Sequence, residues 1–208
     1  MKRTALYRFW MGVVFAAIIC VGCFGKSPSS RFYMLSAIAP DTAVALPESP
    51  ARNAAVGIGP IKIADYLDRS KIITRTSDNR LTLAEYDQWA GSFEDNLTHV
   101  LADNIGVLVP TERIYLYPWR TSLPIDYQVV LDIVRCDGRL GESVDLVVRW
   151  RLMDGGEKDV LAIKRTRIRE AVNGADYDAL VSAHNRALAV LSRQIAATIQ
   201  AASREQAP

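Results

Sequence analysis

Hydrophobic positions divide the chain into one uninterrupted apolar run near the start and a long region of periodic patterns. Residues 9–21, FWMGVVFAAIICV, carry no charge and follow Lys2, Arg3 and Arg8. The run is shorter than the roughly 20 residues that span a hydrocarbon core, and it has the length of the apolar segment of an export signal. The pattern therefore predicts that residues 1–22 are a signal peptide.

Strand patterns open the rest of the chain. Arg31–Leu35 is a short aromatic-rich strand candidate, and the prolines of residues 36–55 favour an extended loop. A second strand begins at Val56, where Gly57, Gly59 and Pro60 indicate a bulge or an edge. The runs KIITRT and LTLAEY, joined by an Asp-Asn turn, then predict a hairpin.

Two later segments have the period of an amphipathic helix. The first is expected to cover about 20 residues and to end near Pro110. The second begins at the N-cap candidate Asp176 and is expected to fray after Ala201. The apolar stripes are Trp89, Phe93, Leu97, Val100, Leu101, Ile105 and Leu108 in the first helix, and Tyr177, Leu180, Val181, His184, Leu188, Leu191, Ile195 and Ile199 in the second.

The segments RIYLYPW, YQVVLDIVRC, SVDLVVRWRLM and DVLAIKRTRIRE predict four more strands between the helices. Turns are expected at Asp137-Gly138 and at residues 154–156, because glycine accepts the positive φ of tight connections. The order of four strands, a helix, four strands and a helix predicts an α+β fold. It is an antiparallel or mixed sheet with two long helices packed on one face, in a single domain of residues 31–203.

The stretch CVGC at the end of the apolar run carries the clearest chemistry. Gly22, a small residue, stands directly before Cys23, and this arrangement resembles the lipobox of bacterial lipoproteins. The resemblance implies that the Cys23 sulfur carries a diacylglycerol and that cleavage frees its amine for a further acyl chain. Cys20 is the competing candidate, but bulky Ile19 precedes it. A plain cleaved signal and a retained membrane anchor remain as alternatives.

Residues 23–30 would then be the lipidated cysteine and a polar tether. Phe24 follows the cysteine where an Asp favours retention at the inner membrane, so the outer membrane, facing the periplasm, is the expected location. Loss of the signal removes three of the 25 Lys and Arg and leaves 22 against 23 Asp and Glu. The near-neutral mature chain lacks the basic excess that nucleic-acid binding requires, so no nucleic-acid partner is expected.

Longer blocks resemble one known family. KIITRTSDNRLTLAEYDQWAGSFEDNLTHVLADNI, LPIDYQVVLDIVRCDGRLGESVDLVVRWRLMD and SAHNRALAVLSRQIA are similar to blocks of the ABC-type transport auxiliary lipoproteins, the paraquat-inducible protein C-like family. The marks include an Ile-x-Thr-Arg strand, a Leu-x-Leu-Ala-Glu-Tyr strand and a helix that a Trp opens and Leu-Ala-x-Asn ends. The resemblance covers roughly residues 31–201.

The resemblance implies a non-catalytic subunit that docks a periplasmic assembly at the outer membrane. Its partners would be an MCE-domain periplasmic protein, membrane transporter components and outer-membrane lipid, and the cargo phospholipid or another hydrophobic molecule. No cofactor is expected beyond the acyl chains on Cys23. A lipid carrier with a cavity between sheet and helices, and a general envelope-integrity lipoprotein, are the alternatives. Exposed strand edges such as Arg31–Leu35 would allow a homo-oligomer.

Candidate sites outside the lipobox are few. His99 and His184 are the two histidines, without metal-like spacing, and no nucleophile elbow or phosphate loop occurs, so no enzyme is expected. Cys136 is interpreted as a small core residue. Two surface candidates remain. The first is an aromatic cluster that could face a partner or lipid, formed by Tyr115, Tyr117 and Trp119. The second is a basic series interpreted as a solvated strand face, with binding of anionic headgroups or of an acidic partner as the alternative, formed by Lys164, Arg165, Arg167 and Arg169.

Overall fold

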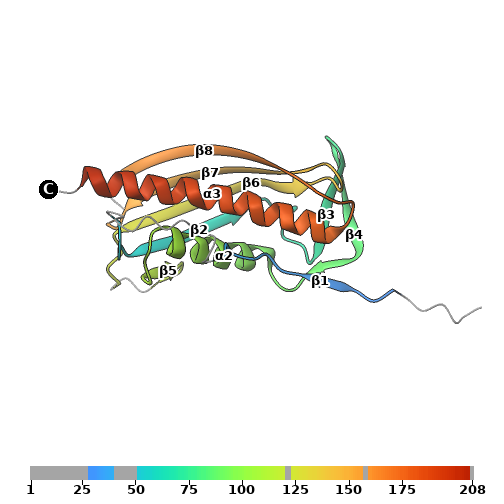
Figure 1. Ribbon diagram of the computed structural model, residues 1–208, viewed down its shortest axis with the longest axis horizontal. Coiled ribbons are helices and arrows are strands. Elements are labelled where there is room, and N and C mark those ends of the chain that lie inside the picture. The colour runs from blue at the N-terminus through green and yellow to red at the C-terminus, as the bar shows by residue number, and fades with distance from the viewer. Residues whose placement is uncertain (1–27, 40–50, 120–122, 157–158, 207–208) are drawn as a thin grey trace, which may run out of the picture. The chain divides into compact units, whose positions relative to one another are not determined.

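A mixed β-sheet forms one layer of the protein, and two helices cover one of its faces (Figure 1). The computed structural model describes residues 28–39, 51–119, 123–156 and 159–206. Contacts divide the chain into residues 1–30 and residues 31–208, and all of the elements below belong to the second unit. The strands are β1 (Arg31–Tyr33), β2 (Val56–Ile63), β3 (Lys71–Ser77), β4 (Arg80–Trp89), β5 (Ile114–Leu116), β6 (Tyr127–Gly138), β7 (Ser143–Asp154) and β8 (Val160–Ala171), and the helices are α2 (Phe93–Leu108) and α3 (Tyr177–Glu205).

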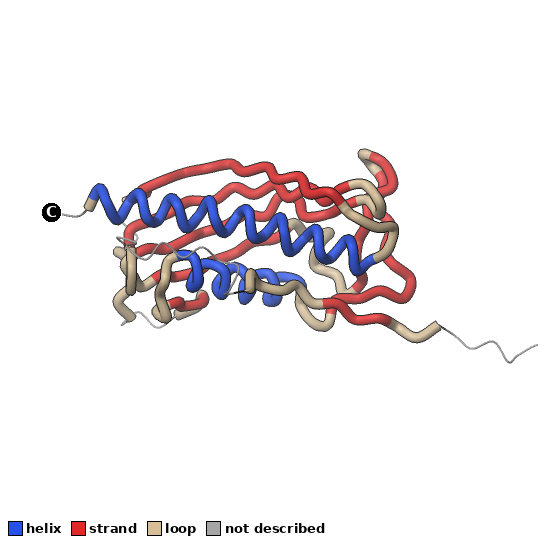
Figure 2. Tube along the Cα trace, in the orientation of Figure 1, coloured by secondary structure: helices blue, strands red, loops and turns tan. Residues whose placement is uncertain are grey.

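The strand order is β1-β4-β3-β6-β2-β5, and β7 and β8 extend the sheet from the other edge of β6. β3–β4, β6–β7 and β7–β8 are antiparallel, whereas β1–β4, β2–β5 and β2–β6 are parallel. α3 packs along β6, β7 and β8, and α2 packs on β2 and β5 (Figure 2). The predicted α+β fold, a mixed sheet with both helices on one face, is confirmed.

The core lies between this sheet and the helices. In β7 the residues Val144, Leu146, Val148 and Leu152 are fully buried, and they alternate with outward-facing positions that are polar or charged except for Val147. The stripe of α3 from Leu180 to Ile199 closes over them. The apolar face of β7, which repeats every two residues, therefore packs against the apolar stripe of α3, which repeats about every 3.6 residues, as the sequence predicts.

The first helix is shorter than predicted. Trp89 is the last residue of β4 and lies outside α2, which has 16 residues and begins at Phe93. Gly91 has a φ of 138°, which redirects the chain, and the Ser92 hydroxyl accepts the Asp95 N–H as the N-cap. Trp89 still joins the core, with its ring 4.8 Å from that of Phe93.

The second helix is longer than predicted. It was expected to fray after Ala201, but the helical backbone continues beyond this residue. The Asp176 carboxylate caps the start of α3 by accepting the Ala179 N–H at 2.8 Å, and the helix continues to Glu205. Ala202 is buried near the end, and the Gln200 side chain donates to the Leu108 carbonyl at 3.2 Å. Tertiary contacts thus add to the helix-forming residues Ala201, Ala202, Arg204 and Glu205 in holding the last turn.

The β6–β7 turn also differs from the prediction. Asp137 and Gly138 lie inside β6, and the turn is residues 139–142, where Gly141 has a φ of 71°. The Arg139 N–H donates to the Ser143 carbonyl at 2.9 Å and closes this turn. The predicted bulge in β2 is present as a register shift between Ile58 and Ile61, but β2 lies inside the sheet rather than at an edge.

Asp137 is a fully buried carboxylate that ties three segments together. Arg75 of β3 donates to it from Nε at 2.8 Å and from Nη2 at 2.9 Å, Tyr66 from its hydroxyl at 2.6 Å and Arg135 from Nε at 3.1 Å. Burial alone would raise the pKa of the Asp137 carboxyl, but the hydrogen bonds from Arg75 and Tyr66 and the nearby Arg135 charge outweigh it and hold the pKa below its ordinary value.

Asp137→Asn is expected to lower the free energy of unfolding at pH 7 by about 3–5 kcal/mol, because the substitution leaves the largely desolvated guanidinium of Arg75, 13% exposed, without its counter-charge. The folded-state pKa of Asp137 is lowered, so its contribution is present above about pH 4 and is lost as pH falls through the folded pKa. Urea unfolding at pH 7 and pH 3 should therefore show a smaller difference between wild type and variant at the lower pH.

Asp132→Asn is the matched control. Asp132 lies on the same strand, but its side chain is 44% exposed and its contact with Arg149 is 3.8 Å. This exposed pair is expected to contribute less than about 1 kcal/mol. Equal losses in the two variants would contradict the role given to Asp137.

Candidate functional site

Three asparagine side chains hold the segment that follows β1. We call residues 34–39 the strap. Its backbone N–H groups donate to amide oxygens of two residues on α2 and one on α3, so that the strap bridges the two helices. The distances are 2.6 Å from Leu35 to Asn96, 2.7 Å from Ile38 to Asn104 and 3.1 Å from Ser36 to Asn185.

Asn104 is the buried member of this set. Its side-chain nitrogen donates to the Ser192 hydroxyl of α3 at 3.1 Å while its oxygen accepts the Ile38 N–H. A fully buried amide with partners on both atoms fixes three segments at once. Asn104 was not among the site residues predicted from the sequence. The signal that could have indicated it is its position, since Asn104 interrupts the apolar stripe of the predicted helix and ends the Leu-Ala-x-Asn motif.

The start of the strap is secured through β1. Arg31 donates to the buried Asp87 carboxylate from Nε at 2.7 Å and from Nη2 at 2.9 Å, and the Tyr33 hydroxyl donates to it at 2.9 Å. Burial, followed by the hydrogen bond to Asp87, raises the pKa of Tyr33 to about 12, so this hydroxyl keeps its proton at neutral pH. The first strand of the fold is therefore fixed by charge as well as by β-pairing.

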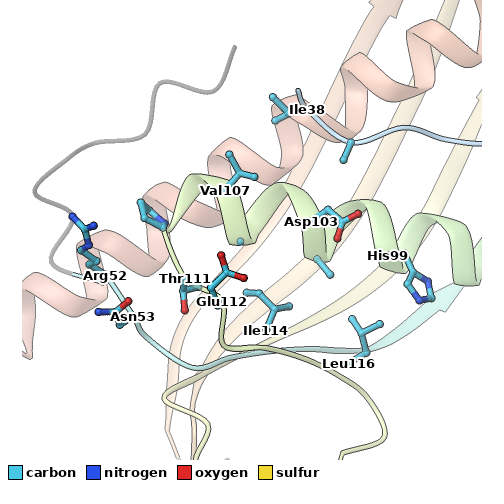
Figure 3. A pocket seen from close by; sticks show the side chains of 14 residues that line it. Ile38, Arg52, Asn53, His99, Asp103, Val107, Thr111, Glu112, Ile114 and Leu116 are labelled. Atoms are coloured by element: carbon cyan, nitrogen blue, oxygen red, sulfur yellow. The ribbon is translucent and has the colours of Figure 1, made fainter. Parts of the chain in front are cut away.

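A surface groove of about 880 Å³ runs beside α2 (Figure 3). Ala102, Gly106 and Val107 of α2 and Ile114 and Leu116 of β5 provide its apolar part. Polar side chains stand around it, and Figure 3 shows them coming from α2, from the segment before β5 and from the segment before β2. These are His99, Asp103, Thr111, Glu112, Arg52 and Asn53.

The groove carries side chains of both charges, Arg52 of one sign and Asp103 and Glu112 of the other. His99 is exposed, and its Nδ1 lies 2.7 Å from the Asp95 carbonyl oxygen of the preceding helical turn. Within the described residues, no three His, Cys, Asp or Glu side chains are placed to hold a metal ion. The arrangement is suited to contact with another molecule.

Two of the three predicted aromatic residues meet. The rings of Tyr117 and Trp119 are 5.5 Å apart in an edge-to-face arrangement, with Tyr117 54% exposed and Trp119 half-buried. Tyr115 is half-buried on β5 in register with Gly57. Tyr117 and Trp119 form what we call the aromatic pair, just beyond the end of β5 at an edge of the described sheet.

Two glycines of β2 make room for this pair. A Cβ on Gly57 would lie 2.9 Å from Cη2 of Trp119, and a Cβ on Gly59 would lie 2.8 Å from Cβ of Tyr117. The sequence indicated only a bulge or an edge at these glycines. The structure adds that the aromatic side chains occupy the space that larger residues would fill.

The other residues considered from the sequence are two core residues, His184 and Cys136, and Cys23. His184 is buried, and burial lowers its pKa. Cys136 is buried, and burial raises the pKa of its thiol to about 12. Cys23 lies outside the described residues. No helix in the described part of the chain is long and apolar enough to cross a membrane.

The fold and the sequence blocks define the class. A family model described as the ABC-type transport auxiliary lipoprotein component matches residues 33–196, nearly all of the described domain. The chain therefore belongs to this family, and the resemblance drawn from the sequence is confirmed.

Named relatives lie within the same class. The intermembrane transport lipoproteins PqiC of Escherichia coli K12 and of Shigella flexneri are each 24% identical to this chain over 173 residues, which cover 83% of this chain and 87% of theirs. The crystal structure of protein XCC0632 from Xanthomonas campestris has the same fold, with a TM-score of 0.68 and 15% identity over 85% of this chain and 100% of that one.

Asn104→Ala is expected to lower the free energy of unfolding by about 2 kcal/mol or more, because it leaves the Ile38 N–H without its acceptor and removes the hydrogen bond that the Ser192 hydroxyl accepts. Hydrogen exchange of the Ile38 amide should accelerate in the same variant. Asn185→Ala removes a solvent-exposed bond of the same type and should cost about 0.5 kcal/mol. Unchanged exchange at Ile38 in Asn104→Ala would contradict this role of the strap.

Proposed function

We propose that this chain is a lipid-anchored, non-catalytic subunit of an intermembrane transport system, held at the outer membrane and facing the periplasm. The observation that carries the proposal is the family match over residues 33–196, preceded in the sequence by CVGC. Two relatives named as intermembrane transport lipoproteins support the transport role. Phospholipid or another hydrophobic molecule is the proposed cargo of the system.

The proposed anchor limits where the folded domain can lie. Seven residues, 24–30, lie between Cys23 and Arg31, the first residue of β1, so the two Cα atoms are eight steps apart along the chain. At about 3.5 Å per extended residue, the chain between them spans at most about 28 Å. Acyl chains on Cys23 would therefore keep β1 close to the membrane, and the Arg31–Asp87 bond and the strap would carry that restraint into the helices.

A non-catalytic role is supported by how the reactive groups are used. The Cys136 thiol has a pKa raised to about 12 by burial, so it is protonated at neutral pH. His184 is enclosed in the core, with Nδ1 2.9 Å from the Leu180 carbonyl oxygen. The Cys136 thiol and the His184 imidazole are thus packed as structural groups of the core.

The partner that we propose is a periplasmic MCE-domain protein with its membrane transporter components. Exposed aromatic side chains supply large contact area at low entropic cost, and they are frequent hot spots of interfaces. The aromatic pair lies at a sheet edge and is therefore the contact surface that we propose. Homo-oligomerisation through strand edges is also part of the proposal, since Phe32 and Met34 at the β1 edge are 65% and 60% exposed.

A direct lipid carrier is the weaker alternative. Between sheet and helices, the space lined by Trp89, Phe93, Cys136 and His184 among others has a volume of about 10 Å³, too small for an acyl chain. The larger groove beside α2 is open to the surface. The described core thus favours an adaptor over a carrier.

Cys23→Ser is expected to abolish labelling by a radioactive or clickable fatty acid and to release the protein from the membrane fraction. The physical reason is that each buried CH₂ contributes about 0.8 kcal/mol of membrane affinity, and the variant has no acyl chains to bury. Cys20→Ser is the matched control and should keep both label and membrane fractionation. Label retained in Cys23→Ser would exclude the proposed attachment site.

Tyr117→Ala is expected to weaken recovery of the MCE-domain partner about tenfold when the full lipoprotein is purified in mild detergent together with the products of its neighbouring genes. Gly57→Ala should act in the same direction, because its Cβ displaces the Trp119 ring. Leu83→Ala is the control, because Leu83 is 51% exposed, close to the 54% of Tyr117, and belongs to β4, which Figure 1 shows at the opposite end of the sheet from β5.

Failure of the wild-type protein to recover any MCE-domain partner would count against the proposed function. Equal recovery with Tyr117→Ala and Leu83→Ala would leave the function standing and would exclude the aromatic pair as the contact. Native mass measurement of the recovered complex gives the copy number of this chain.

A further inference from the structure

The face of β6–β8 that the helices leave uncovered carries a second groove, of about 470 Å³. Five arginines line it, and Asp145 is the one carboxylate among its lining residues. The arginines are Arg75 of β3, Arg135 of β6, and Arg165, Arg167 and Arg169 of β8. We call this feature the arginine groove.

Strand alternation places the arginines of β8 on this face. Arg165, Arg167 and Arg169 are exposed and occupy alternate positions, so their side chains leave the same side of the strand. Lys164 has the opposite parity. Its Nζ lies 2.8 Å from the Thr198 hydroxyl of α3 and 5.5 Å from the centre of the Trp150 ring. All four residues of the predicted basic series are exposed, but the series is divided between two faces, with Lys164 on the side of α3.

A bulge in β6 shapes the floor of the groove. The β6–β7 register shifts between Ile133 and Arg135, and the consecutive residues Val134 and Arg135 both line the groove. In a regular strand they would point to opposite faces, and a bulge allows both to face one way. The concavity is thus built into the backbone of β6 rather than formed by side chains alone.

Acidic partners neutralise one side of the groove. The buried Asp137 pairs with Arg75 and Arg135, and Asp145 pairs with Arg135 at 2.9 Å and with Arg169 at 3.0 Å. Across the described residues, Arg165 and Arg167 form no ion pair. Two carboxylates therefore face five arginines, and the unmatched charge is concentrated on these two side chains.

This arrangement has a cost in the absence of a ligand. Arg165 stands directly opposite Arg149 in the β7–β8 register, and like charges directly opposite each other on a sheet are destabilising. The exposed contact of Arg149 with Asp132, at 3.8 Å, offsets only part of this repulsion. Arg167 follows on the same face, about 6.7 Å further along the strand. An anion between the guanidinium groups would offset this repulsion.

We propose that the arginine groove is a binding site for a phosphate group, which Arg165 and Arg167 contact directly while Arg75 and Arg135 stay fixed by Asp137. The planar fork of a guanidinium matches two oxygens of a phosphate and forms charge-assisted hydrogen bonds with them. A groove of about 470 Å³ also has room for a glycerol-sized substituent on the phosphate. The inference rests on this face alone and is independent of the partner proposed above.

The test is a titration of the full chain, purified in a non-ionic detergent, with inorganic phosphate and with glycerophosphoglycerol, a lipid headgroup diester without acyl chains. Calorimetry or NMR at low salt should show binding of at least one probe with a Kd of about 1 mM or tighter. Arg167→Gln should weaken that binding about tenfold, as expected for the loss of one charge-assisted contact.

Arg151→Gln is the matched control, because it removes the same charge from an exposed position on β7 outside the groove. It should change the Kd by less than about twofold, since Arg151 does not line the groove and would make no direct hydrogen bond to a phosphate bound there. A second readout is thermal unfolding: phosphate should raise the Tm of the wild type and of Arg151→Gln more than that of Arg167→Gln.

The probes distinguish two sources of the phosphate group. Equal binding of both probes assigns the site to the phosphate itself, and tighter binding of the diester assigns it to a lipid headgroup. Either result supports the site. Absence of binding by both probes overturns the proposal. An equal loss in Arg167→Gln and Arg151→Gln also overturns it, because the face would then act only through its diffuse charge, as a surface for an acidic protein would.

Discussion

The rest of the structure depends on burial of the apolar stripe of α3 against the core-facing side of β6–β8. A helix of 29 residues buries Leu180, Leu188, Leu191 and Ile195 completely, and the facing positions of β7 are equally inaccessible. Because side chains alternate along a strand, closing one face of β7 on the helix assigns every second residue to the other face. The charged groove on the uncovered face is a direct consequence of this choice.

Buried polar groups then fix how the other segments join this core. Asp137 ties β3 and the loop after β2 to β6, and Asn104 ties α2 to the strap and to α3. Each is surrounded by donors and acceptors that satisfy it, so burial adds specificity of position without leaving a charge or an amide unpaired. Loss of either partner would expose the full desolvation cost of the remaining group.

These restraints suit the role that we propose. A lipid-anchored adaptor has to transmit the restraint of its anchor to the folded domain, and the Arg31–Asp87 ion pair and the strap would provide this connection. The aromatic pair and the arginine groove present different chemistry, the first mainly apolar and the second cationic. A membrane-proximal body with two such surfaces can contact a protein and an anionic group separately.

The sequence by itself determined what local periodicity encodes. It predicted both helices, the strands, the α+β class and the Asp176 cap, because spacing and capping act over a few residues. It also identified the family, and it indicated an aromatic cluster of which Tyr117 and Trp119 meet.

Only the tertiary structure decided the β6–β7 turn, the true end of α3 and the face on which Lys164 lies. It also decided the roles of Asp137 and Asn104, whose partners Arg75 and Ile38 are 62 and 66 residues away along the chain. A carboxylate beside a glycine is equally compatible with a turn and with a buried ion pair, and only the fold brings the distant arginine that distinguishes them.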